Sequence, residues 1–221
     1  MTTTNKELQT ERAYATLLGL LRDGTLSSGM FLSMPVLVKD IGMPLSAVRE
    51  AVKRAESTGL LSVIPKRGIM VMPADPETTR ECLALRAMFD CEGARCLIEG
   101  GAEMPLAQLR ATHQDLLDRA NSEDFPDLSQ RAISTDLSLH DMLADGIGSQ
   151  LSTRLYAENR DRIAVIQNSR PFLPTRIVSA MSEHLEIIAT LEARDTHAAQ
   201  HAIRRHLHNT LQWWGIQPDQ S

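Results

Sequence analysis

The sequence contains no hydrophobic run long enough to cross a membrane. A transmembrane helix needs roughly 18 consecutive apolar residues, and the apolar runs in this chain are far shorter. The first residues, MTTTNKELQTERAY, also lack the apolar stretch of a signal peptide. With 221 residues, 43% of them hydrophobic, the chain is long enough for one large or two ordinary globular domains, and it is expected to stay in the cytoplasm.

Cysteine is scarce as well. Cys82, Cys91 and Cys96 fall within one helical pattern, and no CxxC spacing is present. An odd number of cysteines at such positions supports neither a disulfide framework nor a zinc ribbon. We expect the three side chains to serve as small buried apolar groups.

The chain also lacks an overall positive charge, because its net charge is −5. The distribution is uneven, however. Residues 1–71 contain nine Lys and Arg and six Asp and Glu, a net of +3, whereas residues 72–221 contain fourteen and twenty-two, a net of −8. The acidic total therefore does not exclude a nucleic-acid partner for the N-terminal part.

Residues 44–71, PLSAVREAVKRAESTGLLSVIPKRGIMV, predict a helix followed by a β-hairpin. Ser46 is expected to cap a helix over 45–58, and Gly59 to end it. Two short β runs, 60–64 and 69–71, then flank the basic tip Pro65-Lys66-Arg67-Gly68.

Two further helical patterns precede this stretch, one at about 5–23 and a shorter one that starts near Met34-Pro35. Gly42 permits the tight corner before the third helix. This order predicts a winged helix-turn-helix domain over residues 1–73.

The candidate DNA-binding residues lie on the third helix and at the hairpin tip. They are Ser46, Arg49, Lys53, Lys66, Arg67 and Gly68. In a winged module, Arg49 and its neighbours would enter the major groove, while Lys66 and Arg67 would reach phosphate or the minor groove. The alternative for each cation is an ordinary solvated surface charge.

Helical patterns without a convincing strand follow the proline-bounded connector 72–76. They cover about 78–99, 105–121, 127–144, 149–170, 174–193 and 196–214. Long amphipathic helices with short connections predict an all-α antiparallel bundle of about six helices, here over residues 77–216. The fold class is thus mainly α.

Asp136, His140, His184 and His206 each lie on the apolar side of a predicted helix. The last helix gives the clearest case, because His206 falls among apolar residues and His197, His201 and His208 lie on the opposite side. Buried polar groups need partners. A divalent metal would satisfy all four, and these ligand types suit zinc, nickel, manganese or iron without distinguishing them. The alternative is a set of hydrogen-bonded core histidines.

The first bundle helix carries a further candidate, Arg86, which shares a face with Leu83 and Leu97 and could bind the carboxylate of an effector. The alternative is an i,i+4 ion pair with Asp90. The far side of this helix carries Leu85, Met88, Phe89 and Cys96, so the helix is either central or at a subunit contact. Asn159, Arg162 and Asn168 lie on a later helix that could line the cavity.

Two sets of motifs resemble known families. The order Gly29, Leu32, Ile41-Gly42, Val48-Arg49-Glu50-Ala51, Gly59-Leu60 and Arg67-Gly68 resembles the N-terminal domain of GntR-family bacterial transcription regulators. Asp136-x3-His140, Ser182-Glu183-His184 ahead of Leu191-Glu192-Ala193-Arg194-Asp195, and Arg205-His206-Leu207 resemble the ligand motifs of the FCD effector domain in the FadR branch.

The resemblance implies a DNA-binding regulator whose four Asp and His ligands hold a metal ion, with a small carboxylate completing the coordination shell. One departure concerns Leu45, which stands in Pro44-Leu45-Ser46-Ala47 where the family usually has Ser-Arg-Thr-Pro. The operator sequence of relatives therefore does not carry over.

The function predicted is a transcription regulator, a repressor, that binds double-stranded operator DNA as a homodimer and responds to a small organic acid. Two alternatives use the same Asp and His residues: a metal-dependent enzyme and a pure metal sensor. No catalytic residue is assigned, because no general base or nucleophile is clearly placed beside the ligands.

Overall fold

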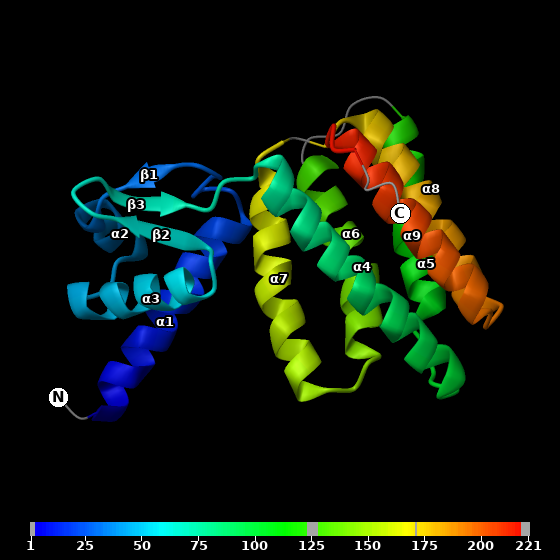
Figure 1. Ribbon diagram of the computed structural model, residues 1–221, viewed down its shortest axis with the longest axis horizontal. Helices are drawn as coiled ribbons and strands as arrows, with labels where there is room; N and C mark the ends of the chain where they lie inside the picture. Colours follow the sequence, from blue (N-terminus) through cyan, green and yellow to red (C-terminus); the bar gives the residue numbers. More distant parts are fainter. Residues whose placement is uncertain (1–2, 123–127, 171, 218–221) are drawn as a thin grey trace. The chain divides into compact units, whose positions relative to one another are not determined.

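The computed structural model of the chain describes residues 3–122, 128–170 and 172–217. Its contacts divide the chain into two compact units. One comprises Met1–Asp75 together with Arg160–Arg170, and the other comprises Pro76–Asn159 with Pro171–Ser221. Figure 1 shows the helices and strands of both.

The first unit combines three helices with a small sheet. Its elements are α1 (Thr3–Arg22), β1 (Phe31–Leu32), α2 (Met34–Ile41), α3 (Leu45–Ser57), β2 (Leu61–Ile64) and β3 (Gly68–Val71). The strands are antiparallel in the order β1-β3-β2 (Figure 1). The three helices and the hairpin agree with the sequence prediction, but β1 was not predicted, because two residues are too short for an alternating pattern.

Helix α3 packs on α1 through one apolar face and leaves the other in solvent. The buried side chains are Ala47, Val48, Ala51, Val52 and Ala55. The expected cap at Ser46 is wrong, since the N-cap residue is Pro44 and the exposed Ser46 lies inside the helix. The C-terminal end follows expectation: Gly59 has φ +73, and the Leu60 amide donates to the Ala55 carbonyl at 2.9 Å.

The wing hairpin turns between Ile64 and Gly68, which are paired in register. Gly68 has φ +110, and a Cβ there would lie 2.5 Å from the carbonyl oxygen of Leu32 on β1. Both the backbone conformation and this close approach require glycine. Gly68 thus allows the basic tip to pack against β1.

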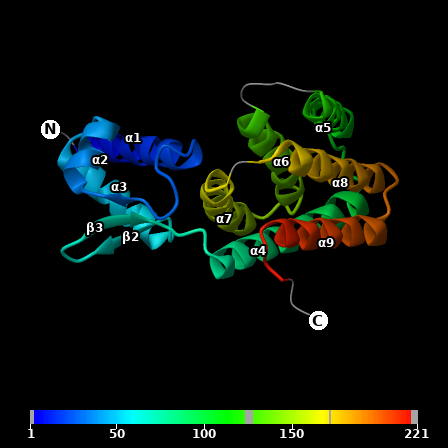
Figure 2. The same cartoon turned by 90° about the horizontal axis from the view of Figure 1, so that it is seen from above.

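The second unit is a helical bundle. Its helices are α4 (Pro76–Glu99), α5 (Leu106–Asn121), α6 (Leu128–Asp145), α7 (Gln150–Asn168), α8 (Pro174–Glu192) and α9 (Thr196–Trp213), with the last part of α7 assigned to the first unit. Helix α5 lies beside α8, and α4 lies beside α9 (Figure 2). These bounds match the predicted helices within a few residues; residue 127, the predicted start of one of them, lies outside the described residues.

A close contact between α4 and α6 positions the centre of this bundle. A Cβ on Gly93 would lie 1.8 Å from the Leu143 carbonyl oxygen, so only glycine allows the two backbones to approach so closely. One turn before it, Asp90 bonds His140, and another turn before that, Arg86 bonds Asp136. Contacts therefore advance together along both helices, which means that α4 and α6 run parallel.

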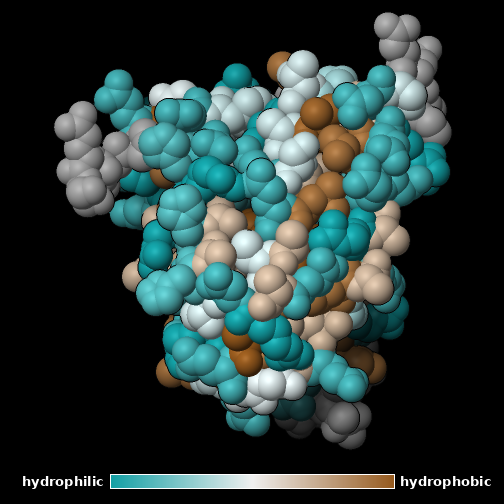
Figure 3. All heavy atoms as spheres, turned by 90° about the vertical axis from the view of Figure 1, so that its right-hand side faces the viewer, coloured by the Kyte–Doolittle hydropathy of each residue, from teal (hydrophilic) through white to brown (hydrophobic). Residues whose placement is uncertain are grey.

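The main core of the bundle lies between α4, α6, α8 and α9 and includes Leu139, Leu143, Ile187, Ile188, Leu191 and Ile203. On the face seen in Figure 3, hydrophilic residues cover most of the surface and hydrophobic ones show in bands between them. Cys82 is buried, whereas Cys91 and Cys96 are half-buried, and these three described cysteines form no disulfide bond. Among the described helices, none combines the length and apolar character that crossing a membrane requires.

Candidate metal and effector site

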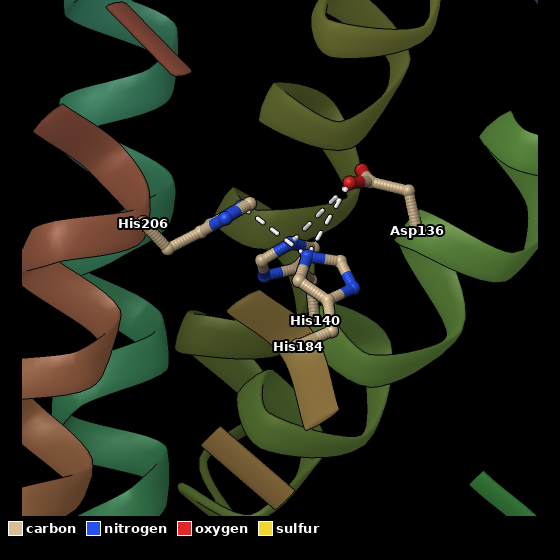
Figure 4. A group of neighbouring side chains, drawn as sticks. All are labelled: Asp136, His140, His184 and His206. Carbon is tan, nitrogen blue, oxygen red and sulfur yellow. Dashed lines mark hydrogen bonds and ion pairs between the residues drawn. The ribbon is translucent and has the colours of Figure 1, made fainter. Parts of the chain in front are cut away.

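The four predicted ligands converge at the centre of the bundle. Asp136 and His140 come from α6, His184 from α8 and His206 from α9 (Figure 4). One ligand atom from each lies within 4.8 Å of all the others, and all four side chains are buried. The expected separation on α9 is also confirmed, because His206 is buried and the other three histidines of that helix are exposed.

Carboxylates outside the group fix the orientation of two imidazoles. His140 Nδ1 donates to Asp90 Oδ2 at 2.8 Å, and His206 Nδ1 donates to Glu183 Oε2 at 2.6 Å. A ring that carries its proton on Nδ1 has a free lone pair on Nε2. Histidines that bind metals are commonly held in this way, with the second nitrogen bonded to a carboxylate.

Burial favours the neutral form of the imidazoles that a metal needs. Burial lowers the pKa of His184 well below its usual value, and the neighbouring histidines lower it further. Burial also lowers the pKa of His206, although the hydrogen bond that His206 donates to Glu183 opposes this shift. Burial alone would raise the pKa of Glu183, but its interactions with His206, Arg176 and Asn209 together lower it.

The geometry of the group fits a divalent ion. His184 Nε2 and His206 Nε2 lie 3.2 Å apart, and two nitrogens bound about 2.1 Å from one ion are roughly 3.0 to 3.4 Å apart at right or tetrahedral angles. His140 Nε2 is buried without a hydrogen-bond partner among the described residues. An ion would satisfy that nitrogen, and three imidazoles with one carboxylate suit a first-row transition metal.

Arg86 reaches this group from α4 and is buried, with 3% of its surface exposed. Its Nη1 donates to Asp136 Oδ2 at 3.1 Å, and its Nη2 lies 3.4 Å from His206 Nε2. The structure thus pairs Arg86 with Asp136, while Asp90, the partner considered from sequence, bonds His140. Arg86 places a cation directly beside the ligand atoms.

A fifth histidine, His113 of α5, was missed in the sequence. It is fully buried, and its ring centroid lies 5.2 Å from that of His184. Burial lowers the pKa of His113, which keeps the ring neutral. The signal was present, since Leu109, His113 and Leu116 recur at helical spacing on one buried face.

Two cavities lie along the seam between α5 and α6. One of about 340 Å³ is lined by residues that include Leu109, Thr112 and Thr135. The other, of about 390 Å³, shares Thr112 and Thr135. Thr112 precedes His113 and Thr135 precedes Asp136 in the chain, so both cavities border the helical turns that carry these two groups.

The three side chains expected on a cavity-lining helix instead bond backbone carbonyls. Asn159 donates to Cys82 at 2.9 Å, Arg162 donates through Nη2 to Thr58 at 2.6 Å, and Asn168 donates to Arg22 at 2.7 Å. Asn159 thus bonds the interior of α4, whereas Arg162 and Asn168 bond the C-terminal ends of α3 and α1. Sequence spacing could not reveal this, because each partner is distant in the chain.

In the first unit, the predicted DNA-binding residues lie on the solvent side of α3 and at the hairpin tip. The four cations and Ser46 are exposed, and Gly68 is partly so. Lys53 bonds Glu50 at 2.9 Å, whereas no salt bridge to Arg49, Lys66 or Arg67 occurs within the part of the chain that the structure describes. Arg54, by contrast, is held by Glu11 at 3.0 Å and stacks over the Tyr14 ring.

Comparison with protein families also divides the chain into an N-terminal part and a helical part. Residues 9–71 match the family described as bacterial regulatory proteins, gntR family, and residues 81–209 match the FCD domain. No curated protein matches the sequence.

Two solved structures share the fold over almost the whole chain. One, a putative transcriptional regulator GntR from Rhodococcus sp. RHA1, has a TM-score of 0.74 at 21% identity, covering 95% of this chain and 99% of that one. E. coli McbR/YncC has a TM-score of 0.71 at 19% identity, covering 93% and 96%. At these identities the likeness establishes the fold and leaves ligands and operators open.

Proposed function

Because this chain belongs to the GntR family of bacterial transcription regulators and carries an FCD effector-binding domain, we propose that a small carboxylate, bound at a divalent metal in the bundle, controls its affinity for operator DNA. In this proposal DNA binding represses transcription, and the acid relieves that repression by releasing the protein from DNA. The family is one of DNA-binding regulators rather than enzymes, and the metal-dependent enzyme considered from sequence is set aside.

The proposed DNA contact uses the exposed cations of α3 and the wing. Arg49 reads base edges in the major groove, and Lys66 and Arg67 bind phosphate or the minor groove. Support comes from their exposure and from the contrast with Arg54, which is tied to Glu11 and Tyr14. Ser46 and Lys53 lie on the same exposed side of α3, and Gly68 shapes the wing.

The metal would be held by Asp136, His140, His184 and His206. A bound ion would supply positive charge and open coordination positions for an anionic oxygen. Arg86 would then bind the second carboxylate oxygen, because coordination of His206 Nε2 to an ion would take away the acceptor that now faces Arg86 Nη2.

The homodimer is proposed to form through α4 and the first part of α7. Exposed apolar side chains gather there: Leu85, Met88, Leu151 and Leu155, with Met88 68% exposed. The two helices are joined beneath them by the edge-on contact of Phe89 and Tyr156, with centroids 5.8 Å apart. A second copy covering this face would bury it and would present two winged modules to a palindromic site, roughly 34 Å apart.

The observation that carries the proposal is the inward lone pair on both His140 and His206, each fixed by a carboxylate on its other nitrogen. The metal-loaded protein would first select an operator from a pool of genomic fragments. Its affinity for that operator would then be measured by fluorescence anisotropy at fixed salt, with and without a panel of small carboxylic acids. An acid that raises the melting temperature should weaken DNA binding at least about fivefold.

A matched pair of variants completes the test. His206→Ala should abolish the response to the acid, whereas His208→Ala, an exposed position on the same helix, should keep it. If removal of metal by a chelator changes DNA affinity but no acid does, the pure metal sensor replaces this proposal. If acids bind and DNA affinity stays constant, the proposed regulation is wrong.

A further inference from the structure

His113 brings an extra polar group to the edge of the metal site. The residue is 0% exposed, and its ring contacts that of His184, with the centroids 5.2 Å apart. The group whose ligand atoms all lie within 4.8 Å of one another contains Asp136, His140, His184 and His206 but not this described fifth histidine. His113 is therefore a neighbour of the cluster rather than a member of it.

The tautomer of His113 follows from its own helix. Nδ1 lies 2.7 Å from the carbonyl oxygen of Leu109, and because a carbonyl can only accept, Nδ1 carries the proton. Nε2 is then a bare acceptor. That atom is buried without a hydrogen-bond partner among the described residues, which is unfavourable unless a donor reaches it.

Such a donor can come from the seam between α5 and α6. The cavities of about 340 and 390 Å³ are lined by Thr112 and Thr135, which directly precede His113 and Asp136 in the chain. A molecule entering there would pass between the helical turns that carry His113 and the carboxylate ligand. Because the ring of His113 contacts that of the candidate ligand His184, the remaining atoms of a small acid bound at the metal can reach this histidine.

We propose that His113 determines effector specificity by accepting a hydrogen bond from a hydroxyl group next to the effector's carboxylate, so that the site selects 2-hydroxy acids over 2-oxo acids. This inference rests on the proposed function, in which a carboxylate binds at the metal. A hydroxyl donates to the lone pair of Nε2, whereas a keto oxygen has no proton to donate and would face it as a second acceptor.

The test compares matched acid pairs on the metal-loaded protein by isothermal titration: lactate with pyruvate, and 2-hydroxyglutarate with 2-oxoglutarate. Wild type should bind one hydroxy acid about tenfold more tightly than its oxo partner. His113→Phe keeps the ring shape but has no acceptor, so that preference should vanish through weaker binding of the hydroxy acid. His113→Gln offers an amide oxygen in a similar direction and should restore part of it.

His201→Gln, at an exposed position on α9, serves as the control and should retain the wild-type ratio. Metal content, measured by elemental analysis, should be equal in all four proteins, because His113 is not a ligand in this account. Loss of metal from both His113 variants, or an unchanged preference in His113→Phe, would overturn the inference while leaving the proposed function standing. Absence of binding by any of the acids to metal-loaded wild type would overturn both.

Discussion

The two units of the chain use charge in opposite ways. In the first unit, Arg49, Lys66 and Arg67 stand in solvent, on a scaffold whose core is apolar. In the second, Arg86 and Asp136 are ion-paired in the interior, with side chains 3% and 5% exposed. The exposed cations are available to bind another molecule, whereas the two buried charges already form an ion pair with each other.

The difference matters for energetics. An exposed cation keeps its hydration, so deleting it changes binding to DNA but hardly the stability of the fold. When one member of a buried ion pair is deleted, no water replaces it beside the remaining charge. The deletion therefore lowers the stability of the fold before it affects binding. The predictions below test this contrast, beginning with the change expected to have the largest effect.

Arg86→Met should destabilise the metal-free protein by about 3 kcal/mol, because it leaves the buried Asp136 carboxylate without its cation. Metal should restore most of this loss, since the ion neutralises Asp136 itself, and the variant should bind metal more tightly because a like charge has been removed. Chemical denaturation with chelator and with excess metal measures both effects.

Arg95→Met is the control for this variant. Arg95 lies on the same helix but in exposed pairs with Glu92 and Glu99, so the change should alter stability by less than about 1 kcal/mol in either condition. Equal losses for Arg86→Met with and without metal would mean that the ion does not sit against Asp136.

Gly93→Ala should destabilise the bundle by about 3 kcal/mol, since its Cβ would lie 1.8 Å from the Leu143 carbonyl oxygen and must push α4 away from α6. The same shift would stretch the neighbouring Asp90–His140 bond and weaken metal binding. Gly19→Ala, within α1 with no atom within 4 Å of the added carbon, should instead be neutral or stabilising. Thermal melting and metal titration compare the two, and equal melting temperatures would contradict the steric argument.

Sequence patterns located most of these parts because their signals are local. The candidate ligands were identified one helix at a time: each of Asp136, His140, His184 and His206 interrupts an apolar face, and each such face can be recognised without knowing which helices pack against it. The bounds of α4 to α9 followed from the same periodicity and from breakers such as Gly100-Gly101.

The pairings between helices could not be predicted in this way. Asp90 was considered as an i,i+4 partner for Arg86. In the structure α4 and α6 lie parallel, so that Asp90 bonds His140 and Arg86 bonds Asp136. The close packing at Gly93 contributes to that register, and a glycine within a helical pattern does not reveal what it touches. Ser46 failed as a cap for a local reason, since the N-cap is Pro44, two residues before Ser46.

Glu183→Gln should weaken metal binding by about 10- to 100-fold, because the charged acceptor that orients His206 becomes a neutral amide. Glu192→Gln, an exposed position at the end of the same helix where Glu192 pairs with Arg110, should leave metal affinity unchanged. Competition titration with a chelator gives both constants. Should the two variants bind metal equally well, the orienting role of Glu183 would be disproved.

Arg49→Ala should have the smallest effect on stability but should still weaken binding to operator DNA. Operator affinity should fall about tenfold, equivalent to about 1.4 kcal/mol, while the unfolding free energy changes by less than about 0.5 kcal/mol. Arg12→Ala removes the same charge from an exposed position on α1, so it should lower affinity much less if position on α3 matters. Equal losses in both variants, measured by anisotropy across a salt series, would show that only the net charge of the unit attracts DNA.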